Sequence, residues 1–219
     1  VHLEKLDLLE KNKIKNKTDT YKVTNELPKE SAIKLQNVSF KYFGSENFLF
    51  KDINLNIKKG VHTVLTGSNG SGKSTLLGII SGILIPEQGE VFSSSNKLAY
   101  VGATPLIIKG TLKENLLYGN NLEVTDDEIY NLLNDFKLFN DEKISLEKSV
   151  TNKILSSGQM QKVSFIRALL SDPDILILDE STSNLDLDSK NIINNYLDTL
   201  NLTIINSTHN NQDTNHDLH

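Results

Sequence analysis

The stretch "GSNGSGKST", Gly67–Thr75, contains the pattern that decides how this chain of 219 residues folds. It matches G-x-x-x-x-G-K-[ST], follows a short apolar run and opens the helical pattern of Lys73–Ile80. Glycines let the backbone wrap around phosphate oxygens and point its N–H groups at them. The helix that follows places its positive end at the same anion. The stretch therefore predicts a phosphate-binding loop between a strand and a helix.

The predicted loop supplies side chains as well as backbone groups. We expect Lys73 to reach the β- and γ-phosphates of a nucleotide and Ser74 to bind Mg²⁺. The other positions expected to contact the nucleotide are Gly67, Ser68, Asn69, Gly70, Ser71, Gly72 and Thr75. The alternative, a turn rich in Gly and Ser without a ligand, is disfavoured by the number of matched positions and by their context.

A second motif follows much later in the chain, in "DILILDE", Asp174–Glu180. Four apolar residues lead into two carboxylates, and an apolar strand that ends in Asp beside a phosphate loop is the usual Mg²⁺ position. We therefore expect Asp179 to hold the metal and Glu180 to polarise a water that attacks the γ-phosphate. The alternative is a strand end with solvated acids, which the phosphate loop makes less attractive.

The hydropathy pattern predicts an α/β fold, in which an edge β-subdomain accompanies a core of alternating strands and helices. Residues 32–42 and 48–57 alternate between apolar and polar, as half-buried strands do. Residues 175–179 and 202–207 are continuous apolar or β-branched runs, which are typical of central strands covered on both faces. Helical spacing marks four stretches: Lys73–Ile80, Asp126–Phe136, Gly158–Leu170 and Ser189–Leu200.

Composition narrows the classes of partner. The net charge is -5, which argues against nucleic acid, and the absence of cysteine excludes disulfides and thiolate metal sites. The longest apolar run, Leu76–Ile85, is far shorter than the roughly 20 residues of a membrane span, so we expect a soluble chain. Residues 1–31 predict a short amphipathic helix followed by a Lys/Asn-rich linker, and the main domain is expected to begin at residue 32.

The stretch "LSSGQMQKVSFIRALL", Leu155–Leu170, resembles the signature of ATP-binding-cassette (ABC) ATPases, which is LSGGQ followed by a helix with an Arg-Ala pair. Ser157 replaces the first glycine of that signature. The resemblance covers about residues 33–209 and implies a P-loop ATPase core with a parallel sheet, an antiparallel β-subdomain and a helical subdomain of about residues 104–170 that carries the signature. It also implies ATP and Mg²⁺ as ligands. In this family Ser156, Gly158 and Gln159 would complete the ATP site of a second subunit.

Other motifs fit the same family. Tyr42 matches the aromatic residue that stacks on adenine, although Phe40 or Phe43 could stack instead. "SNLD", Ser183–Asp186, resembles the D-loop, which crosses the dimer interface, and His209 resembles the switch histidine that contacts the γ-phosphate. The resemblance implies ATP hydrolysis, with Glu180 as the base and with Lys73 and His209 stabilising charge.

The stretch "GTLKENLLYG", Gly110–Gly119, is similar to the segment that follows the Q-loop in exporter-type cassettes. We therefore expect an ABC ATPase domain over residues 32–219, with a shortened C-terminal end, excised from a longer exporter. Its partners would be a second nucleotide-binding domain, identical or not, and a transmembrane domain, so that the domain lies at the cytoplasmic face of a membrane. Soluble ABC proteins of translation or DNA repair are a less favoured interpretation, because their second cassette or long coiled coil is missing.

Two departures from the family keep a second function open. Ala103 stands where the family has the Q-loop glutamine, and the Glu-x-Gly element expected just before the signature is absent. The first hypothesis is a transport ATPase that dimerises around ATP. The alternative is a degenerate regulatory domain that binds nucleotide with little or no hydrolysis.

Overall fold

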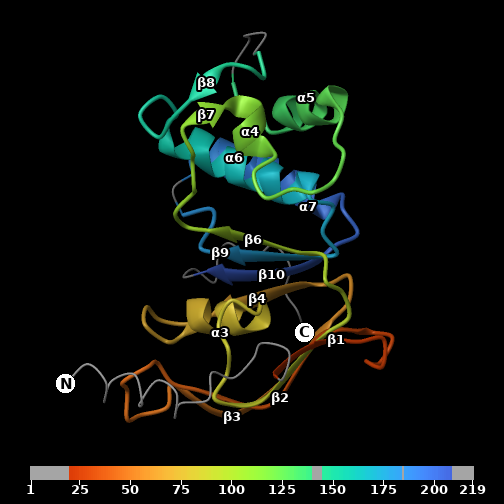
Figure 1. The fold of residues 1–219 in the computed structure, drawn as a ribbon, viewed down its shortest axis with the longest axis vertical. Helices are drawn as coiled ribbons and strands as arrows, with labels where there is room; N and C mark the ends of the chain where they lie inside the picture. The colour runs from red at the N-terminus through yellow and green to blue at the C-terminus, as the bar shows by residue number, and fades with distance from the viewer. Residues whose placement is uncertain (1–19, 140–144, 184, 209–219) are drawn as a thin grey trace, which may run out of the picture.

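The computed structural model describes residues 20–139, 145–183 and 185–208. Helices and strands form stacked layers, with a helical layer, a parallel sheet, one helix and a second sheet following one another along the long axis (Figure 1). The parallel sheet has the strand order β4-β10-β9-β6 and the second sheet the order β1-β5-β2-β3. The strands of these two sheets are β1 (Tyr21–Val23), β2 (Ser31–Phe40), β3 (Phe50–Lys58), β4 (His62–Thr66), β5 (Gln88–Ser93), β6 (Leu98–Gly102), β9 (Ile175–Asp179) and β10 (Thr203–Thr208).

The helices divide between the two faces of the parallel sheet. Helix α3 lies between the two sheets, whereas α4, α5, α6 and α7 lie on the other side of the parallel sheet (Figure 1). A short two-stranded sheet, β7 with β8, accompanies the helical layer. These elements are α3 (Lys73–Ile80), β7 (Gly110–Thr111), α4 (Leu112–Leu116), α5 (Asp126–Asp135), β8 (Ser149–Val150), α6 (Ser157–Leu170) and α7 (Leu187–Asp198). The arrangement confirms the predicted α/β fold with a parallel sheet and an antiparallel β-subdomain.

Strand β9 explains why its sequence is a continuous apolar run. Successive side chains of a strand point to opposite faces. Ile175 and Ile177 accordingly pack into the core around α3, and Leu176 and Leu178 pack into the core of the helical layer. The strand is hydrogen-bonded to β10 on one side and to β6 on the other, in parallel on both sides. It is therefore a central strand covered on both faces, as the sequence predicts.

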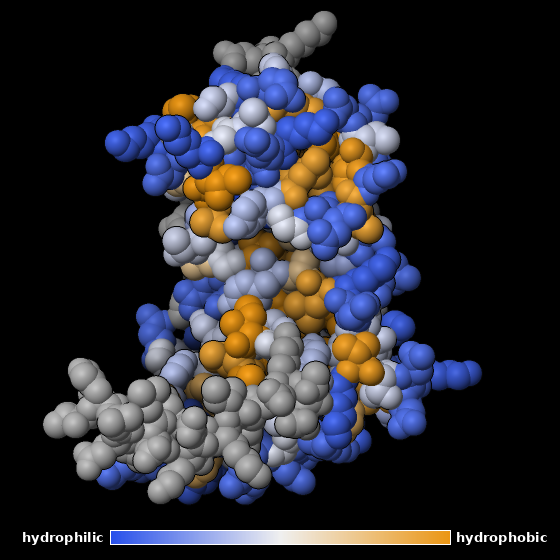
Figure 2. Space-filling view, viewed as in Figure 1, coloured by the Kyte–Doolittle hydropathy of each residue, from blue (hydrophilic) through white to orange (hydrophobic). Residues whose placement is uncertain are grey.

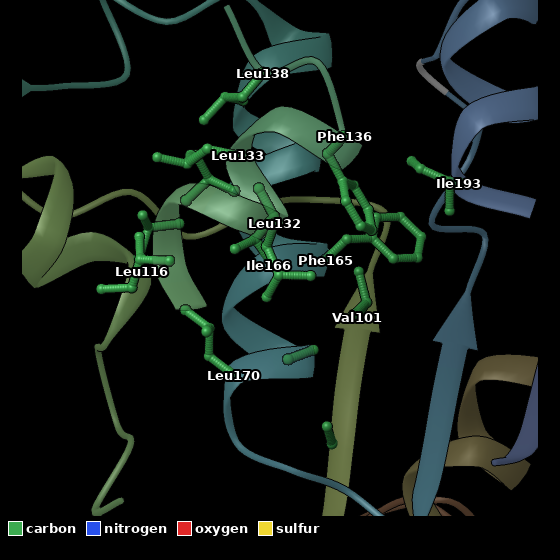
Figure 3. Packing of buried hydrophobic residues seen from close by; sticks show 14 of the residues in the cluster. Val101, Leu116, Leu132, Leu133, Phe136, Leu138, Phe165, Ile166, Leu170 and Ile193 are labelled. Carbon is green, nitrogen blue, oxygen red and sulfur yellow. The ribbon is translucent and has the colours of Figure 1, made fainter. Parts of the chain in front are cut away.

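The core of the helical layer joins it to the parallel sheet. Phe136, which follows α5, packs against Phe165 of α6 with 6.4 Å between ring centroids (Figure 3). It also contacts Tyr196 of α7, at 5.1 Å. Val101 of β6 belongs to the same cluster, so that the signature helix α6 packs on the sheet whose strand β9 ends at Asp179, the predicted metal-binding residue.

Three helices of the helical layer begin with the same hydrogen-bonded cap. The hydroxyls of Thr111, Thr125 and Ser156 each accept from the backbone N–H three residues later, and a Glu or Gln side chain there accepts from the backbone N–H of the capping residue. Such a capping box satisfies two N–H groups that a helix start leaves without partners. The starts of these helices therefore follow from local chemistry, and the predicted ranges of the long helices agree with the structure to within two residues.

The antiparallel subdomain begins earlier than the sequence suggests. Strand β1 lies within the stretch assigned to the linker, and it pairs in parallel with β5 through Tyr21 and Val91. The Tyr21 hydroxyl also donates to the carbonyl of Ile80 at 3.1 Å, which attaches β1 to α3. The linker prediction is thus wrong for residues 21–23, because a strand this short carries too little hydropathy signal. The predicted amphipathic helix near residue 1 lies outside the described residues.

The surface is largely hydrophilic, with separate apolar patches on the face drawn in Figure 2. Most large apolar side chains lie in the two cores, and the most exposed ones are Phe43 at 93%, Leu187 at 72% and Ile83 at 64%. Within the described part of the chain, none of the helices has the length and hydropathy needed to cross a membrane.

Candidate nucleotide-binding site

The predicted phosphate loop connects the end of β4 to the start of α3, as the sequence indicates. Gly70 and Gly72 have φ of 78° and 95°, in the left-handed region that favours glycine. Gly72 is also the N-cap of α3, and a Cβ there would lie 2.6 Å from Cζ of Phe50. Both the backbone conformation and the close approach of Phe50 therefore require glycine at this position.

The Lys73 ammonium folds back over the loop that precedes it. It donates to the carbonyl oxygens of Gly67 and Ser68, at 2.9 and 3.2 Å, and Lys73 is only 8% exposed. The loop thus encloses a positive charge beside the N-terminus of α3, whose backbone N–H groups carry partial positive charge. This arrangement can bind the phosphates of a nucleotide, since both groups favour an anion at the same point.

Asp179 lies at the C-terminal end of β9, where three hydroxyl groups converge on its carboxylate. Oδ1 accepts from Ser74 Oγ at 2.9 Å and from Ser207 Oγ at 2.7 Å, and Oδ2 accepts from the Tyr100 hydroxyl at 2.7 Å. Burial, and secondly the hydrogen bond to Asp179, raise the pKa of Tyr100 well above its ordinary value. Ser74 and Asp179, 105 residues apart in the sequence, are therefore brought together as the motifs predict.

These residues fit a magnesium ion that is shared with a nucleotide. Mg²⁺ prefers oxygen ligands, and it is usually held by one or two carboxylates together with substrate phosphates and water. Ser74 and Asp179 offer one hydroxyl and one carboxylate in contact. Among the described residues, no group of three or more His, Cys, Asp and Glu side chains could hold a metal ion alone. The site thus suits a metal that arrives with phosphate oxygens.

Glu180 follows Asp179 directly, at the point where the chain leaves the sheet. Its φ of 50° is unusual for a residue other than glycine, and such conformations concentrate at functional sites. The backbone N–H of Glu180 donates to Ser207 Oγ at 3.2 Å. The same serine hydroxyl thus accepts from Glu180 and donates to the carboxylate of Asp179. The turn that takes the chain out of the sheet therefore begins directly after the predicted metal-binding residue.

The predicted adenine-stacking residue is tied to the helix of the phosphate loop. The Tyr42 hydroxyl and Thr75 Oγ1 are hydrogen-bonded at 2.6 Å, and Tyr42 is 52% exposed. Its ring meets Phe40 edge to face, with centroids 5.1 Å apart. Phe40, which ends β2, is only 6% exposed and offers no free face for a base, whereas Phe43 is 93% exposed. Tyr42 lies two residues beyond the end of β2 instead of at its end.

The signature residues lie apart from the phosphate loop within this chain, because α6 and α3 cover opposite faces of the parallel sheet (Figure 1). Ser156 is the N-cap of α6, and its hydroxyl accepts from the Gln159 N–H at 3.2 Å. Accepting leaves the hydroxyl hydrogen available for another acceptor. Ser156 is exposed, and Gly158 lies near Leu185, which follows β9. The start of α6 can therefore present donors to a ligand held by another molecule.

The predicted D-loop and switch regions are described only in part. His209 and Asn184 lie outside the described residues. Asp186 is the N-cap of α7, and its carboxylate accepts from the N–H of Ser189 at 2.8 Å. This backbone hydrogen bond, and secondly the one from the Ser189 hydroxyl, lower the pKa of Asp186.

The structure adds contacts that sequence patterns do not indicate. Tyr100 and Ser207 hold Asp179 from the two neighbouring strands. Gln161 of α6 is fully buried, and its amide donates to the carbonyl of Gly102 at 3.0 Å, beside Ala103. Thus a glutamine from the signature helix approaches the segment that lacks its own. Ser207 pairs with Asp179 in the register of β10 against β9, which the sequence alone does not provide.

A glycine-rich loop between a strand and a helix, a contact between Ser74 and Asp179 at its edge and a parallel sheet define a P-loop nucleotide-binding domain. Comparison with known proteins narrows the class. The ABC transporter family profile matches residues 50–183, which is more than half of the chain. The chain therefore belongs to the ABC transporter family.

Comparison with individual proteins supports the same family. The ATP-dependent permease MDL1 of Candida albicans is 39% identical over 203 residues, which cover 81% of this chain and 29% of MDL1. A solved bacterial Atm1-family ABC exporter with ATP bound shares the fold, with a TM-score of 0.75 at 20% identity, over 84% of this chain and 35% of that one. The chain thus spans about a third of the length of these relatives.

Proposed function

We propose that this chain is the ATP-binding and ATP-hydrolysing domain of an ABC exporter, which dimerises around ATP to power transmembrane transport. The observation that carries the proposal is the 2.9 Å contact between Ser74 of the phosphate loop and Asp179 at the end of β9. It joins the two halves of a phosphate and Mg²⁺ site that neither sequence motif forms alone. The family of the chain and the names of its relatives support the transport role.

The proposed mechanism gives each predicted site residue one role in binding or hydrolysing ATP. The loop N–H groups and the Lys73 ammonium bind the phosphates, and Ser74 and Asp179 would hold Mg²⁺, which neutralises charge on phosphate oxygens. Glu180 accepts a proton from the attacking water, because its carboxylate follows the metal-binding position directly. His209 is proposed to stabilise charge on the γ-phosphate. Tyr42 stacks on the base, and its hydrogen bond to Thr75 fixes the ring relative to the phosphate loop.

The proposed dimer follows from the separation of the signature from the loop. With α6 and α3 on opposite faces of one sheet, Ser156 and Gly158 serve the ATP of a second domain, while this loop receives the signature of the partner. Closure would exclude water around the γ-phosphate and strengthen each electrostatic contact there. A transmembrane domain at the cytoplasmic face of a membrane would then use that closure for transport.

The test compares ATP hydrolysis and ATP binding in the wild type and in Glu180→Gln. We expect Mg²⁺-dependent hydrolysis in the wild type and at least a hundredfold lower rate in the variant, since a general base contributes about 10²–10⁴-fold. ATP binding should be retained in both proteins. Equal rates in the two proteins, with ATP bound by both, would remove the enzymatic part of the proposal.

One observation favours a second function, a regulatory domain that binds ATP with little or no hydrolysis. Ala103, which follows β6, has only a methyl group where the family has a glutamine. Position 103 therefore adds no side-chain oxygen to the proposed metal site. The same comparison decides between the two functions. A wild type as inactive as Glu180→Gln, yet able to bind ATP, would favour the regulatory domain.

A further inference from the structure

The carboxylate of Asp179 is held from both neighbouring strands. Strand β9 lies between β10 and β6, and Asp179 pairs in register with Ser207 on one side and with Gly102 on the other. From β10, the Ser207 hydroxyl reaches Oδ1 at 2.7 Å, and from β6 the Tyr100 hydroxyl reaches Oδ2 at 2.7 Å. Each carboxylate oxygen thus has a donor from a different strand.

Tyr100 is the residue through which β6 reaches this carboxylate. Residues two apart on a strand project from the same face, so Tyr100 and Gly102 share the face on which Asp179 lies. Gly102 has no side chain, and Ala103 has only a methyl group. The long side chain of Tyr100 therefore spans the distance from two residues earlier, and its hydroxyl is the oxygen that β6 contributes beside the metal-binding position.

The orientation of a carboxylate depends on such donors. Rotation about the last bond of an Asp side chain is broad and has no sharp staggered minima. Ser74 and Ser207 both donate to Oδ1, whereas Tyr100 donates to Oδ2. The two donors at Oδ1 still allow Oδ2 to change position by rotation of the carboxylate. The hydrogen bond from Tyr100 fixes the plane of the carboxylate, which decides where a ligated metal lies.

We propose that Tyr100 is a positioning residue of the metal site, holding the Asp179 carboxylate in the orientation that accepts Mg²⁺ together with the nucleotide. The proposal rests on the proposed function, because it needs a metal at Ser74 and Asp179. It assigns to Tyr100 an effect on metal affinity with no contact to the phosphates. Loss of a hydrogen-bonding partner behind a metal ligand typically weakens metal affinity 10- to 100-fold.

The test is a Mn²⁺ titration of the full chain with a non-hydrolysable ATP analogue, in which free Mn²⁺ is read by electron paramagnetic resonance. Tyr100→Phe keeps the ring and removes the hydroxyl. We expect it to raise the Mn²⁺ dissociation constant about 10-fold or more. Tyr130→Phe is the matched control, because Tyr130 is 37% exposed against 36% for Tyr100 and lies on α5, in the helical layer. It should leave the dissociation constant unchanged.

A second measurement separates positioning from general damage. Binding of a fluorescent ATP analogue in EDTA reports the phosphate loop without metal, and Tyr100→Phe should bind it as the wild type does. An unchanged Mn²⁺ constant in Tyr100→Phe, or equal weakening of metal-free nucleotide binding, would overturn the proposal. Asp179→Asn separates failure of the proposed metal site from failure of the role of Tyr100. If Asp179→Asn also leaves Mn²⁺ binding intact, the proposed metal site itself is wrong. If Asp179→Asn loses Mn²⁺ binding while Tyr100→Phe keeps it, only the role of Tyr100 is refuted.

Discussion

Replacing Gly72 with alanine tests how tightly the phosphate loop is packed against the antiparallel subdomain. Alanine at a φ of 95° costs about 1–2 kcal/mol, because its Cβ crowds the backbone in the left-handed region. The new Cβ would also lie 2.6 Å from Cζ and 3.0 Å from Cε1 of Phe50, so the ring must move, which costs about 1–3 kcal/mol more. We therefore expect Gly72→Ala to lower the free energy of unfolding by about 2–5 kcal/mol.

Gly44→Ala separates the two causes. Gly44 has a φ of 80°, and no described heavy atom lies within 4 Å of a Cβ placed there, so only the cost of about 1–2 kcal/mol for the backbone conformation applies. Urea denaturation followed by far-UV circular dichroism measures both variants, since the chain has no tryptophan for fluorescence. If Gly72→Ala destabilises the chain no more than Gly44→Ala, the argument that Phe50 closes against the loop is wrong.

Four further predictions follow from the caps and from the base-stacking residue. Ser156→Arg should leave ATP binding to the monomer intact but abolish ATP-dependent dimerisation in analytical ultracentrifugation, and loss of monomer binding would contradict this. Thr125→Ala should lower the free energy of unfolding by about 0.5–2 kcal/mol in urea, because it removes the cap of α5. The N–H of Thr125, and secondly its hydroxyl, hold the pKa of Glu128 below its ordinary value. The stabilisation that the ionised Glu128 gives is therefore present above the ordinary pKa and is lost as the pH falls through the lowered pKa. Glu128→Gln should flatten the fall of the free energy of unfolding at acidic pH in urea melts, and an unchanged fall would refute this. Tyr42→Phe should keep the ATP affinity within about threefold of the wild type in calorimetric titration, since the ring stacks on the base and the hydroxyl bonds to Thr75. A loss of affinity above tenfold would assign the hydroxyl a direct role.

The local parts of the site could be predicted from the sequence because they depend on short-range chemistry. The glycines of the phosphate loop predict a left-handed backbone conformation, and Gly70 and Gly72 adopt it in the structure. The predicted start of α3 at Lys73 agrees with the structure, and so does the burial of β9 on both faces. Each of these features is determined by residues within a few positions of one another, which is the range over which periodicity and turn chemistry operate.

Contacts that cross the sheet could not be predicted in the same way. Tyr100 and Asp179 are 79 residues apart, and their hydrogen bond depends on the register of β6 against β9. The register follows from packing of the whole sheet, which one strand does not encode. Gln161 reaches Gly102 across 59 residues for the same reason. Strand β1 was missed because three residues are too few to show alternation.

The most direct test of the central claim, that the phosphate loop binds ATP through Lys73 and the N-terminus of α3, is isothermal titration calorimetry of MgATP into the wild type and into Lys73→Ala. We expect saturable binding of one ATP to each wild-type chain. We expect at least tenfold weaker binding to the variant, because the ammonium enclosed by the loop is lost. Equal affinities of the two proteins, or no binding to the wild type, would contradict the claim.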